Sequence, residues 1–159
     1  PTLTSNLHHE VELVVAIGIG GSNIRAADAH RHIYGYAVGL DMTRRDLQND
    51  MKKQGRPWCI GKGFEHSAPI GPITPAAQVP AVEAADIALT VNGSGRQRSS
   101  VAKLIWNIAE TIEQLSAAWT LQPGDLIFTG TPEGVGAVVR GDVLYATVEG
   151  LEPLTVRVV

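Results

Sequence analysis

The stretch HHEVELVVAIG, residues 8–18, has the composition of a β-strand whose side chains alternate between two faces. Glu10 and Glu12 then share one face with Val14, and their Cα atoms are expected about 6.5–7 Å apart. Two like charges this close are unfavourable unless a cation or water lies between them. Carboxylate oxygens suit a hard cation such as Mg²⁺ or Mn²⁺. A solvated face at the start of an edge strand has the same pattern, so the pair alone leaves both interpretations open.

A third carboxylate follows the next predicted strand. Residues 34–40 are expected to form a strand, and Asp41 follows it directly. Residues 43–53 are expected to form a helix, because Thr43 and Asp46 have the spacing of a capping box and two lysines occupy the last turn. Asp41 therefore lies where an apolar strand meets the start of a helix. That position is common for functional carboxylates, although the spacing by itself favours a plain turn residue.

Strands dominate the rest of the chain. Residues 87–98 are predicted to form a hairpin around the turn NGSG, and further strands are expected at 126–129, 143–148 and 154–158. One long helix is predicted over 101–119, after two serines that are candidate caps. Its apolar residues follow helical spacing, at Val101, Leu104, Ile105, Ile108, Ile112, Leu115 and Trp119. This helix is expected to be scaffold or interface rather than part of a reaction site.

Composition limits the possible functions. The 159 residues carry a net charge of −3, and their basic residues form only isolated doublets, which argues against a nucleic-acid partner. No apolar stretch is long enough to span a membrane, and no signal-peptide pattern is present. The single cysteine, Cys59, excludes an internal disulfide and favours a reducing compartment, so a cytoplasmic location is predicted.

Five stretches together resemble the fumarylacetoacetate hydrolase family, in its order and spacing. They are HHEVELVVAIG, GYAVGLDMTRRDLQ, GRPWCIGKGFEHSAPIGP, LTVNGSGRQ and GDLIFTGTPEGVG. The similarity runs from about Asn6 to Val159, and the chain is most similar to the branch that cleaves fumarylpyruvate in bacterial gentisate breakdown. The resemblance implies metal-dependent hydrolysis of a carbon–carbon bond in an acylpyruvate, giving fumarate and pyruvate from fumarylpyruvate.

The resemblance also implies which residues form the site. Glu10, Glu12 and Asp41 match the family's ligands of a divalent metal, Mg²⁺ or Mn²⁺. His8 and His9 are then neighbours of the metal site rather than ligands, since the family uses carboxylates.

The substrate residues follow in the same way. Lys62 and Gln48 match catalytic positions, and Thr131 matches a substrate-binding threonine in a glycine-rich turn. Arg44 and Arg45 are further candidates for binding a diketo acid. The family commonly has a small residue where Arg44 stands, so this additional cation is a candidate partner for the far carboxylate of the substrate. A solvated helix face is the alternative.

The implied fold is β-rich α+β, with the rolled mixed β-sheet of the family's C-terminal domain and a few helices. Residues 1–159 would form a single catalytic domain in a homodimer. Family members carry a lid segment with a catalytic histidine and glutamate upstream of the E-x-E strand, and Pro1 lies only nine residues before Glu10. We therefore expect the chain to be part of a longer protein. Oxaloacetate decarboxylation and a non-catalytic metal and dicarboxylate-binding module are the alternatives.

Overall fold

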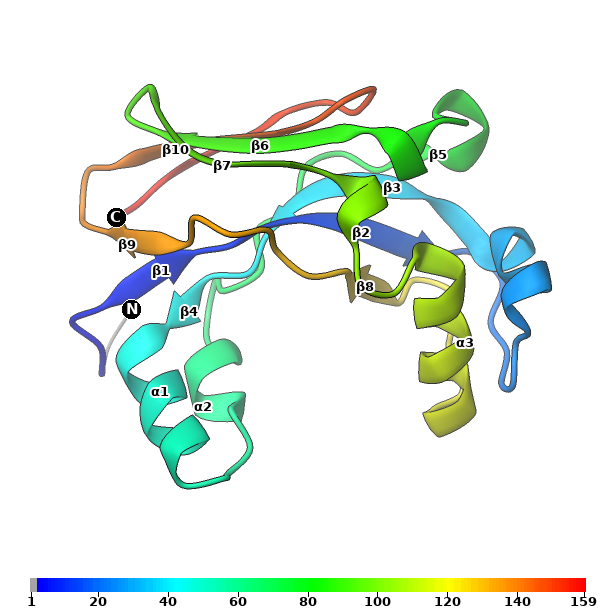
Figure 1. Ribbon diagram of the computed structural model, residues 1–159, viewed down its shortest axis with the longest axis horizontal. Helices are drawn as coiled ribbons and strands as arrows, with labels where there is room; N and C mark the ends of the chain where they lie inside the picture. The colour runs from blue at the N-terminus through cyan, green and yellow to red at the C-terminus, as the bar shows by residue number, and fades with distance from the viewer. Residues whose placement is uncertain (1–2) are drawn as a thin grey trace.

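The protein consists mainly of β-strands with a few short helices, in a computed structural model that describes residues 3–159 (Figure 1). The strands form three sheets, and all strand pairs described there are antiparallel. The predicted β-rich α+β fold class is confirmed. The sheets are antiparallel, however, whereas a mixture of parallel and antiparallel strands was predicted. Two parallel neighbouring strands need a connection that carries the chain back to the end of the sheet where the first strand began. Each pair of strands described here runs in opposite directions instead.

The three sheets have simple orders. The central sheet is β5-β3-β2-β8, the outer sheet is β11-β10-β6-β7, and a small sheet is β4-β1-β9. The strand bounds are Leu7–His9 (β1), Val11–Ile17 (β2), Ile33–Leu40 (β3), Thr43–Arg44 (β4), Thr74–Pro75 (β5), Asp86–Val91 (β6), Ser94–Ser100 (β7), Leu126–Phe128 (β8), Gly136–Val138 (β9), Val143–Val148 (β10) and Leu154–Arg157 (β11). The strands predicted near the C-terminus correspond to β8, β10 and β11.

β2 is the centre of the fold. It pairs with β3 on one side and β8 on the other, and all seven of its residues are buried. Because β2 and β3 also contact β6 and β10 of the outer sheet, the core lies between these two sheets. Burial of an apolar side chain contributes about 1.5–3 kcal/mol. The largest fully buried side chains include Leu13, Ile17, Leu40, Leu89, Ile112 and Leu144.

The hairpin of β6 and β7 turns at the predicted position. Asn92 and Gly93 both have positive φ angles, 51° and 80°, as a two-residue type I′ turn requires. Leu89 lies opposite Gln97, but the next residue, Thr90, lies opposite Gly95, so the pairing register shifts between them. This bulge leaves one extra residue in β7 and changes the direction of the side chains around it.

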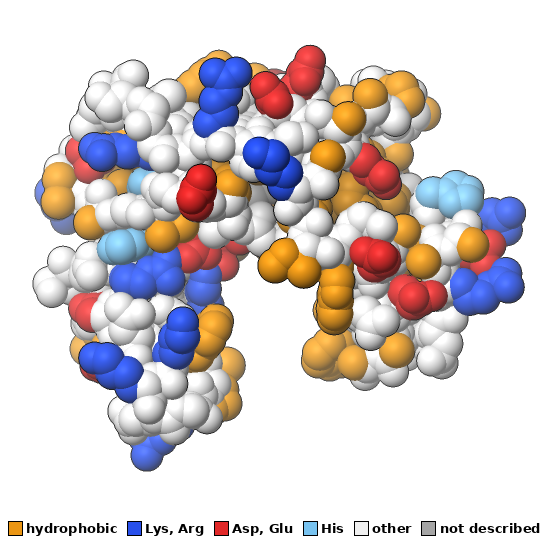
Figure 2. All heavy atoms as spheres, viewed as in Figure 1, with side chains coloured by type: hydrophobic (Ala, Val, Ile, Leu, Met, Phe, Trp, Pro, Cys, Tyr) orange, Lys and Arg blue, Asp and Glu red, His pale blue; other side chains and the backbone are white. Residues whose placement is uncertain are grey.

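The helices project from the sheets on two sides (Figure 1). α1 and α2 lie on one side and α3 on the other, and Figure 2 shows the surface hollowed between them. No helix in residues 3–159 combines the length and apolar character needed to cross a membrane. The α-helices are Arg45–Lys53 (α1), Cys59–Lys62 (α2) and Ile108–Ala118 (α3), and the 3-10 helices are Ala26–His32 (η1), Ala76–Gln78 (η2), Val82–Ala84 (η3) and Val101–Lys103 (η4).

The predicted capping box before α1 is wrong. Thr43 pairs with His8 in the small sheet, and its hydroxyl donates to the carbonyl of Asp41 at 3.1 Å instead of capping the helix. The Asp46 carboxylate accepts from the hydroxyl of Thr4 at 2.6 Å. The helix therefore starts two residues later than expected, because strand pairing with β1 holds the backbone of Thr43 in an extended conformation.

The long helix predicted over 101–119 is also wrong at its start. A short 3-10 helix is followed by a bend, and α3 begins only after Asn107. Asn107 and Glu110 form a reciprocal capping box at 2.9 Å for each bond, which supplies a strong start signal at this point. Ile105 and Trp119 lie outside the helix and are 98% and 66% exposed, so they do not belong to its apolar face.

Candidate active site

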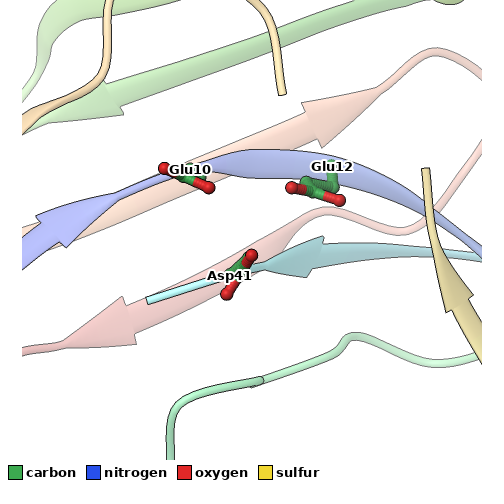
Figure 3. Close-up of side chains that lie close together, drawn as sticks. All are labelled: Glu10, Glu12 and Asp41. Atoms are coloured by element: carbon green, nitrogen blue, oxygen red, sulfur yellow. The ribbon is translucent and has the colours of Figure 1, made fainter. Parts of the chain in front are cut away.

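Two adjacent strands bring three carboxylates together (Figure 3). Glu10 lies between β1 and β2, Glu12 lies in β2, and Asp41 directly follows β3. Val11 pairs with Leu40 in the β2–β3 register. The N–H of Asp41 donates to the carbonyl of Glu10 at 2.8 Å, which continues that register by one residue. One ligand oxygen from each carboxylate lies within 4.8 Å of the other two, so the structure brings the three predicted metal ligands together.

The carboxylates are held in a partly desolvated place. Glu10 is 7% exposed and Glu12 is 4% exposed. Burial raises the pKa of Glu12 to about 7, and the negative charges of Asp41 and Glu10 add to the increase. The 2.7 Å hydrogen bond from the N–H of Gly130 acts in the opposite direction and lowers this pKa. Burial also raises the pKa of Asp41, although the hydrogen bond from Lys62 opposes it. Charge in this cluster is therefore costly unless cations neutralise it.

Two cations of the chain already contact the cluster. The ammonium of Lys62 lies 2.7 Å from Oε2 of Glu10 and 2.5 Å from Oδ2 of Asp41. The guanidinium of Arg45 donates to Oε1 of Glu10. Burial alone would lower the pKa of Lys62, but the hydrogen bonds to Asp41 and Glu10 outweigh it and the pKa is raised. Lys62 therefore stays protonated at neutral pH and provides a positive charge rather than a base.

The three carboxylates fit a hard divalent cation. Their donor atoms are oxygens alone, and they converge from two strands with their backbone fixed by sheet pairing. Mg²⁺ and Mn²⁺ take oxygen ligands and often retain water in part of their coordination shell, which leaves positions for substrate oxygens. Glu10, Glu12 and Asp41 would hold the ion, with Lys62 in contact with two of these carboxylates.

The affinity for Mn²⁺ is expected to rise with pH up to neutrality and then to level off. With a pKa of about 7, Glu12 carries a proton below neutrality in the metal-free protein, and this proton must leave before the ion binds. The apparent Kd should rise about tenfold for each pH unit below 7. Calorimetric titration from about pH 5.5 to about pH 8, in buffers of different ionisation enthalpy, measures both affinity and proton release. An affinity that stays constant across this range would contradict the prediction.

The close packing of α2 on α1 places Lys62 at the cluster. A Cβ atom on Gly61 would lie 2.9 Å from Cβ of Gln48 and 3.1 Å from its Cα, so only glycine allows this approach. Gln48 itself is buried, and its Oε1 accepts from the guanidinium of Arg45 at 3.2 Å. The predicted catalytic residues Gln48 and Lys62 and the predicted substrate residue Arg45 are thus brought to one place.

The glycine-rich turn after β8 brings Thr131 to the same region. Gly130, next to Thr131, donates its N–H to Glu12. Gly134 has a φ of 98°, and a Cβ atom there would lie 2.2 Å from the carbonyl oxygen of Arg96, so the turn lies directly against β7. The glycines therefore permit a close approach that any larger residue would prevent.

Gln97 is a residue of this region that sequence reasoning missed. It closes the stretch LTVNGSGRQ and is the single buried residue of β7, at 3% exposure. Its Nε2 donates to the hydroxyl of Thr131 at 2.8 Å. A signal was present in the sequence, because Gln97 lies between Arg96 and Arg98 in an alternating strand and so occupies the face where an apolar residue is expected.

The structure separates the two arginines that were predicted together. Arg45 contacts the carboxylates, whereas the guanidinium of Arg44 lies 4.4 Å from the ring centroid of Phe64 and 3.4 Å from the carbonyl oxygen of Ile60. Arg44 is only 9% exposed, and its Nε has no hydrogen-bond partner among residues 3–159. Arg44 is therefore not a solvent-exposed residue on a helix face, which was the alternative interpretation. Its role in substrate binding stays a prediction.

The two histidines beside the glutamates contact other side chains, although Nε2 of His9 is buried without a hydrogen-bond partner among residues 3–159. Nε2 of His8 lies 3.0 Å from Oδ1 of Asn6, and its Nδ1 accepts from Arg45 at 3.4 Å. Nδ1 of His9 lies 3.0 Å from Oε1 of Gln97. Neither histidine belongs to the group of converging ligand atoms, in line with their interpretation as neighbours.

Comparison with known proteins gives a consistent result. The family model for the fumarylacetoacetate (FAA) hydrolase C-terminal domain matches residues 1–159. The chain is 53% identical over 158 residues to a fumarylpyruvate hydrolase of Ralstonia sp., a match that covers 99% of this chain and 82% of that protein. It is 41% identical to the mitochondrial oxaloacetate tautomerase of Rattus norvegicus, covering 99% of this chain and 72% of that protein.

A solved structure is equally similar. The crystal structure of fumarylpyruvate hydrolase from Pseudomonas aeruginosa, in complex with Mn²⁺ and pyruvate, superimposes with a TM-score of 0.98 at 57% sequence identity. The match covers 100% of this chain and 68% of that one. At this identity the likeness extends to sequence as well as fold.

Proposed function

This chain belongs to the fumarylacetoacetate hydrolase family, and from that premise we propose that it hydrolyses an acylpyruvate, with fumarylpyruvate as substrate and fumarate and pyruvate as products. The observation that carries the proposal is the convergence of Glu10, Glu12 and Asp41 beside the protonated side chain of Lys62. Identity to fumarylpyruvate hydrolases above half of the aligned positions supports the choice of substrate.

The reaction adds water to the carbonyl carbon of the acyl group and breaks its bond to the neighbouring methylene carbon. The electron pair of that bond passes to the pyruvate part as an enolate, which then takes a proton on carbon. A divalent ion held by Glu10, Glu12 and Asp41 supplies Lewis-acid stabilisation of the negative oxygens when it is bound. The chain's own residues must bind the diketo acid, orient it and place positive charge where the enolate forms.

Lys62 and its neighbours are suited to these tasks. The ammonium of Lys62 is half-buried and charged at neutral pH, so it can donate hydrogen bonds to an oxyanion in this partly desolvated site. Gln48 has both donor and acceptor atoms and is held by Arg45. The hydroxyl of Thr131 lies in the turn that also contacts Glu12 through Gly130. Together they orient the substrate carboxylate and keto groups.

We propose that the base activating water lies outside residues 1–159. His8 and His9 are the histidines next to the cluster in the chain. Both ring nitrogens of His8 have partners, whereas Nδ1 of His9 faces Gln97 and its unpartnered Nε2 is buried from solvent. The relatives are longer than this chain, which covers 82% of the Ralstonia protein and 68% of the Pseudomonas chain.

The test of the function is loss of the enol absorbance of fumarylpyruvate, coupled to detection of pyruvate. It compares these 159 residues with a version that includes the upstream coding segment, each with Mn²⁺, with Mg²⁺ and with chelator. Metal-dependent release of pyruvate by the longer version is expected. Failure of both versions to release pyruvate would exclude fumarylpyruvate as the substrate.

A second candidate function is tautomerisation of oxaloacetate, favoured by the 41% identity to the rat mitochondrial enzyme. It needs the same stabilisation of an enolate but no attack by water and no bond cleavage. The two are separated by supplying enol-oxaloacetate and following its conversion to the keto form. Tautomerisation without pyruvate release from fumarylpyruvate would favour this candidate, and release of carbon dioxide would indicate decarboxylation.

Selectivity for a dicarboxylic acylpyruvate is expected to depend on Arg44. Its buried guanidinium has no carboxylate partner among the described residues, and a buried cation without an anion is costly. Arg44→Ala should raise KM for fumarylpyruvate about tenfold or more while leaving KM for acetylpyruvate, which lacks the second carboxylate, nearly unchanged. Arg56→Ala, at an exposed position, is the matched control. Equal effects on both substrates would contradict this role.

We further propose a homodimer in the cytoplasm. Ile105 and Trp106 are 98% and 55% exposed and form one wall of a cavity of about 450 Å³, whose other wall includes Gly130 and Thr131 of the candidate active site. Contiguous exposed apolar groups of this kind mark interaction surfaces. Cys59 is free and exposed, which agrees with a reducing compartment. Sedimentation equilibrium tests the dimer, and a monomer at micromolar concentration would contradict it.

A further inference from the structure

Gln97 links the junction of β1 and β2 to the Thr131 turn. Its Oε1 lies 3.1 Å from the N of Val11 and 3.0 Å from Nδ1 of His9. Its Nε2 lies 2.8 Å from Oγ1 of Thr131 and 2.8 Å from the carbonyl oxygen of Pro132. The side chain is thus satisfied at four points in the interior, by segments far from it in sequence. His9 and Val11 are the residues on either side of the candidate metal ligand between them.

Two backbone groups determine which way the Gln97 amide points. The N–H of Val11 can only donate, so the amide oxygen must face it; the carbonyl of Pro132 can only accept, so the amide nitrogen must face it. His9 then carries its proton on Nδ1 and donates to the same oxygen. Both hydrogens of Nε2 are used, one by Pro132 and the other by Thr131. At this contact the hydroxyl of Thr131 can only accept.

The hydrogen of the Thr131 hydroxyl is consequently left free to donate. A threonine hydroxyl has one hydrogen and two acceptor lone pairs. The contact with Gln97 uses one lone pair and cannot use the hydrogen, so the hydrogen is available to another group. A donor in this position complements an oxygen that can only accept, such as a carboxylate or keto oxygen of an acylpyruvate. Gln97 and Thr131 are both uncharged, so this arrangement can orient the substrate without changing the charge of the cluster.

We propose that Gln97 is a positioning residue that makes the Thr131 hydroxyl a hydrogen-bond donor toward the substrate. The proposal rests on the proposed function, because it takes an acylpyruvate or its pyruvate product as the ligand of Thr131. Gln97 also ties the turn to the backbone around Glu10, which keeps the donor at a fixed place relative to the carboxylates.

Gln97→Glu is the most direct test. The carboxylate has nearly the same shape but cannot donate, so it accepts from the Thr131 hydroxyl and turns that hydrogen away from the substrate. We expect KM for fumarylpyruvate and the inhibition constant of pyruvate to rise about tenfold or more, with a smaller fall in kcat and little change in Mn²⁺ affinity. Gln78→Glu, at an exposed position, is the matched control. A lower melting temperature with unchanged KM would show a structural role alone and overturn the proposal.

A double-mutant cycle shows whether Gln97 acts through Thr131. In the Thr131→Val background the hydroxyl is absent, so Gln97→Glu should produce no further rise in KM. Fully additive effects of the two substitutions on KM would overturn the proposal.

A measurement on the unaltered protein applies even where Gln97→Glu does not fold. Neutron diffraction of the protein with Mn²⁺ and pyruvate locates the deuterium of the Thr131 hydroxyl. It is expected to point toward pyruvate, and a deuterium directed at Gln97 would overturn the proposal. Because this readout needs no turnover, a protein that fails to cleave fumarylpyruvate contradicts the proposed function separately. Cleavage with an unchanged KM in Gln97→Glu contradicts only the positioning role.

Discussion

Glu12→Gln is expected to abolish metal-dependent cleavage while making the metal-free protein more stable. Glutamine keeps the size of the side chain and still accepts the hydrogen bond from Gly130, but it removes one of the three charges that hold the ion. Loss of several kcal/mol of charge stabilisation in the transition state corresponds to a fall in kcat/KM of about 10³-fold or more. Affinity for Mn²⁺ should fall in parallel.

The gain in stability follows from the pKa of Glu12. A carboxyl whose pKa is raised from 4.5 to about 7 on folding binds its proton more tightly in the folded state. Its ionisation therefore costs the folded protein stability as pH rises from about 4.5 to 7, reaching about 3 kcal/mol above neutrality. Glutamine avoids that cost, so the free energy of unfolding at about pH 8, without metal, should rise by up to about 3 kcal/mol.

Both parts are measured on the same preparations. Thermal and denaturant unfolding at about pH 5 and about pH 8 give the stability, and the coupled pyruvate assay gives the activity. Glu65→Gln, at an exposed position outside the group of converging carboxylates, is the control and should leave both unchanged. Retained activity together with unchanged Mn²⁺ affinity in Glu12→Gln would refute the assignment of this residue as a metal ligand.

Lys62→Met is expected to lower kcat/KM about 10²–10³-fold without preventing metal binding. Methionine keeps much of the length of the side chain and removes the ammonium that contacts Glu10 and Asp41. Removing one preorganised donor to a developing oxyanion typically costs this much. Since Lys62 is not one of the three candidate ligands and its positive charge repels a cation held by Glu10 and Asp41, Mn²⁺ affinity should stay the same or increase.

The measurements of kcat/KM and of Mn²⁺ affinity together identify the role of Lys62. A purely structural role would lower stability and reduce the active fraction, but it would leave kcat per active site unchanged. Titration of active sites with Mn²⁺, followed by kcat and KM at saturating metal, distinguishes the cases. Lys53→Met, in the exposed last turn of α1, is the control. Full activity of Lys62→Met would show that Arg45 and the metal suffice for the enolate charge.

Local patterns in the sequence predicted the longer strands correctly, but not the short strands β4, β5 and β9 or the 3-10 helices. The turn at Asn92 and Gly93, the strands β8, β10 and β11, and the strand before Asp41 all follow from short-range preferences of glycine, asparagine and β-branched residues. Helix starts were predicted less well. Thr43 had the spacing of a cap, but pairing with β1 overrode it, and the apolar spacing from residue 101 onward extended past the real start at Asn107.

The sequence alone determined the chemistry available to this protein: three carboxylates in two strand contexts, a lysine between two glycines and a threonine in a glycine-rich turn. Those features depend only on residue type and on spacing along the chain, and both can be read directly from the sequence. Only the tertiary structure decided that Arg45 rather than Arg44 contacts Glu10, and that Gln97 orients Thr131. Both outcomes depend on segments far apart in the chain, whose side chains meet only through sheet register and helix packing, and no local pattern encodes those distances.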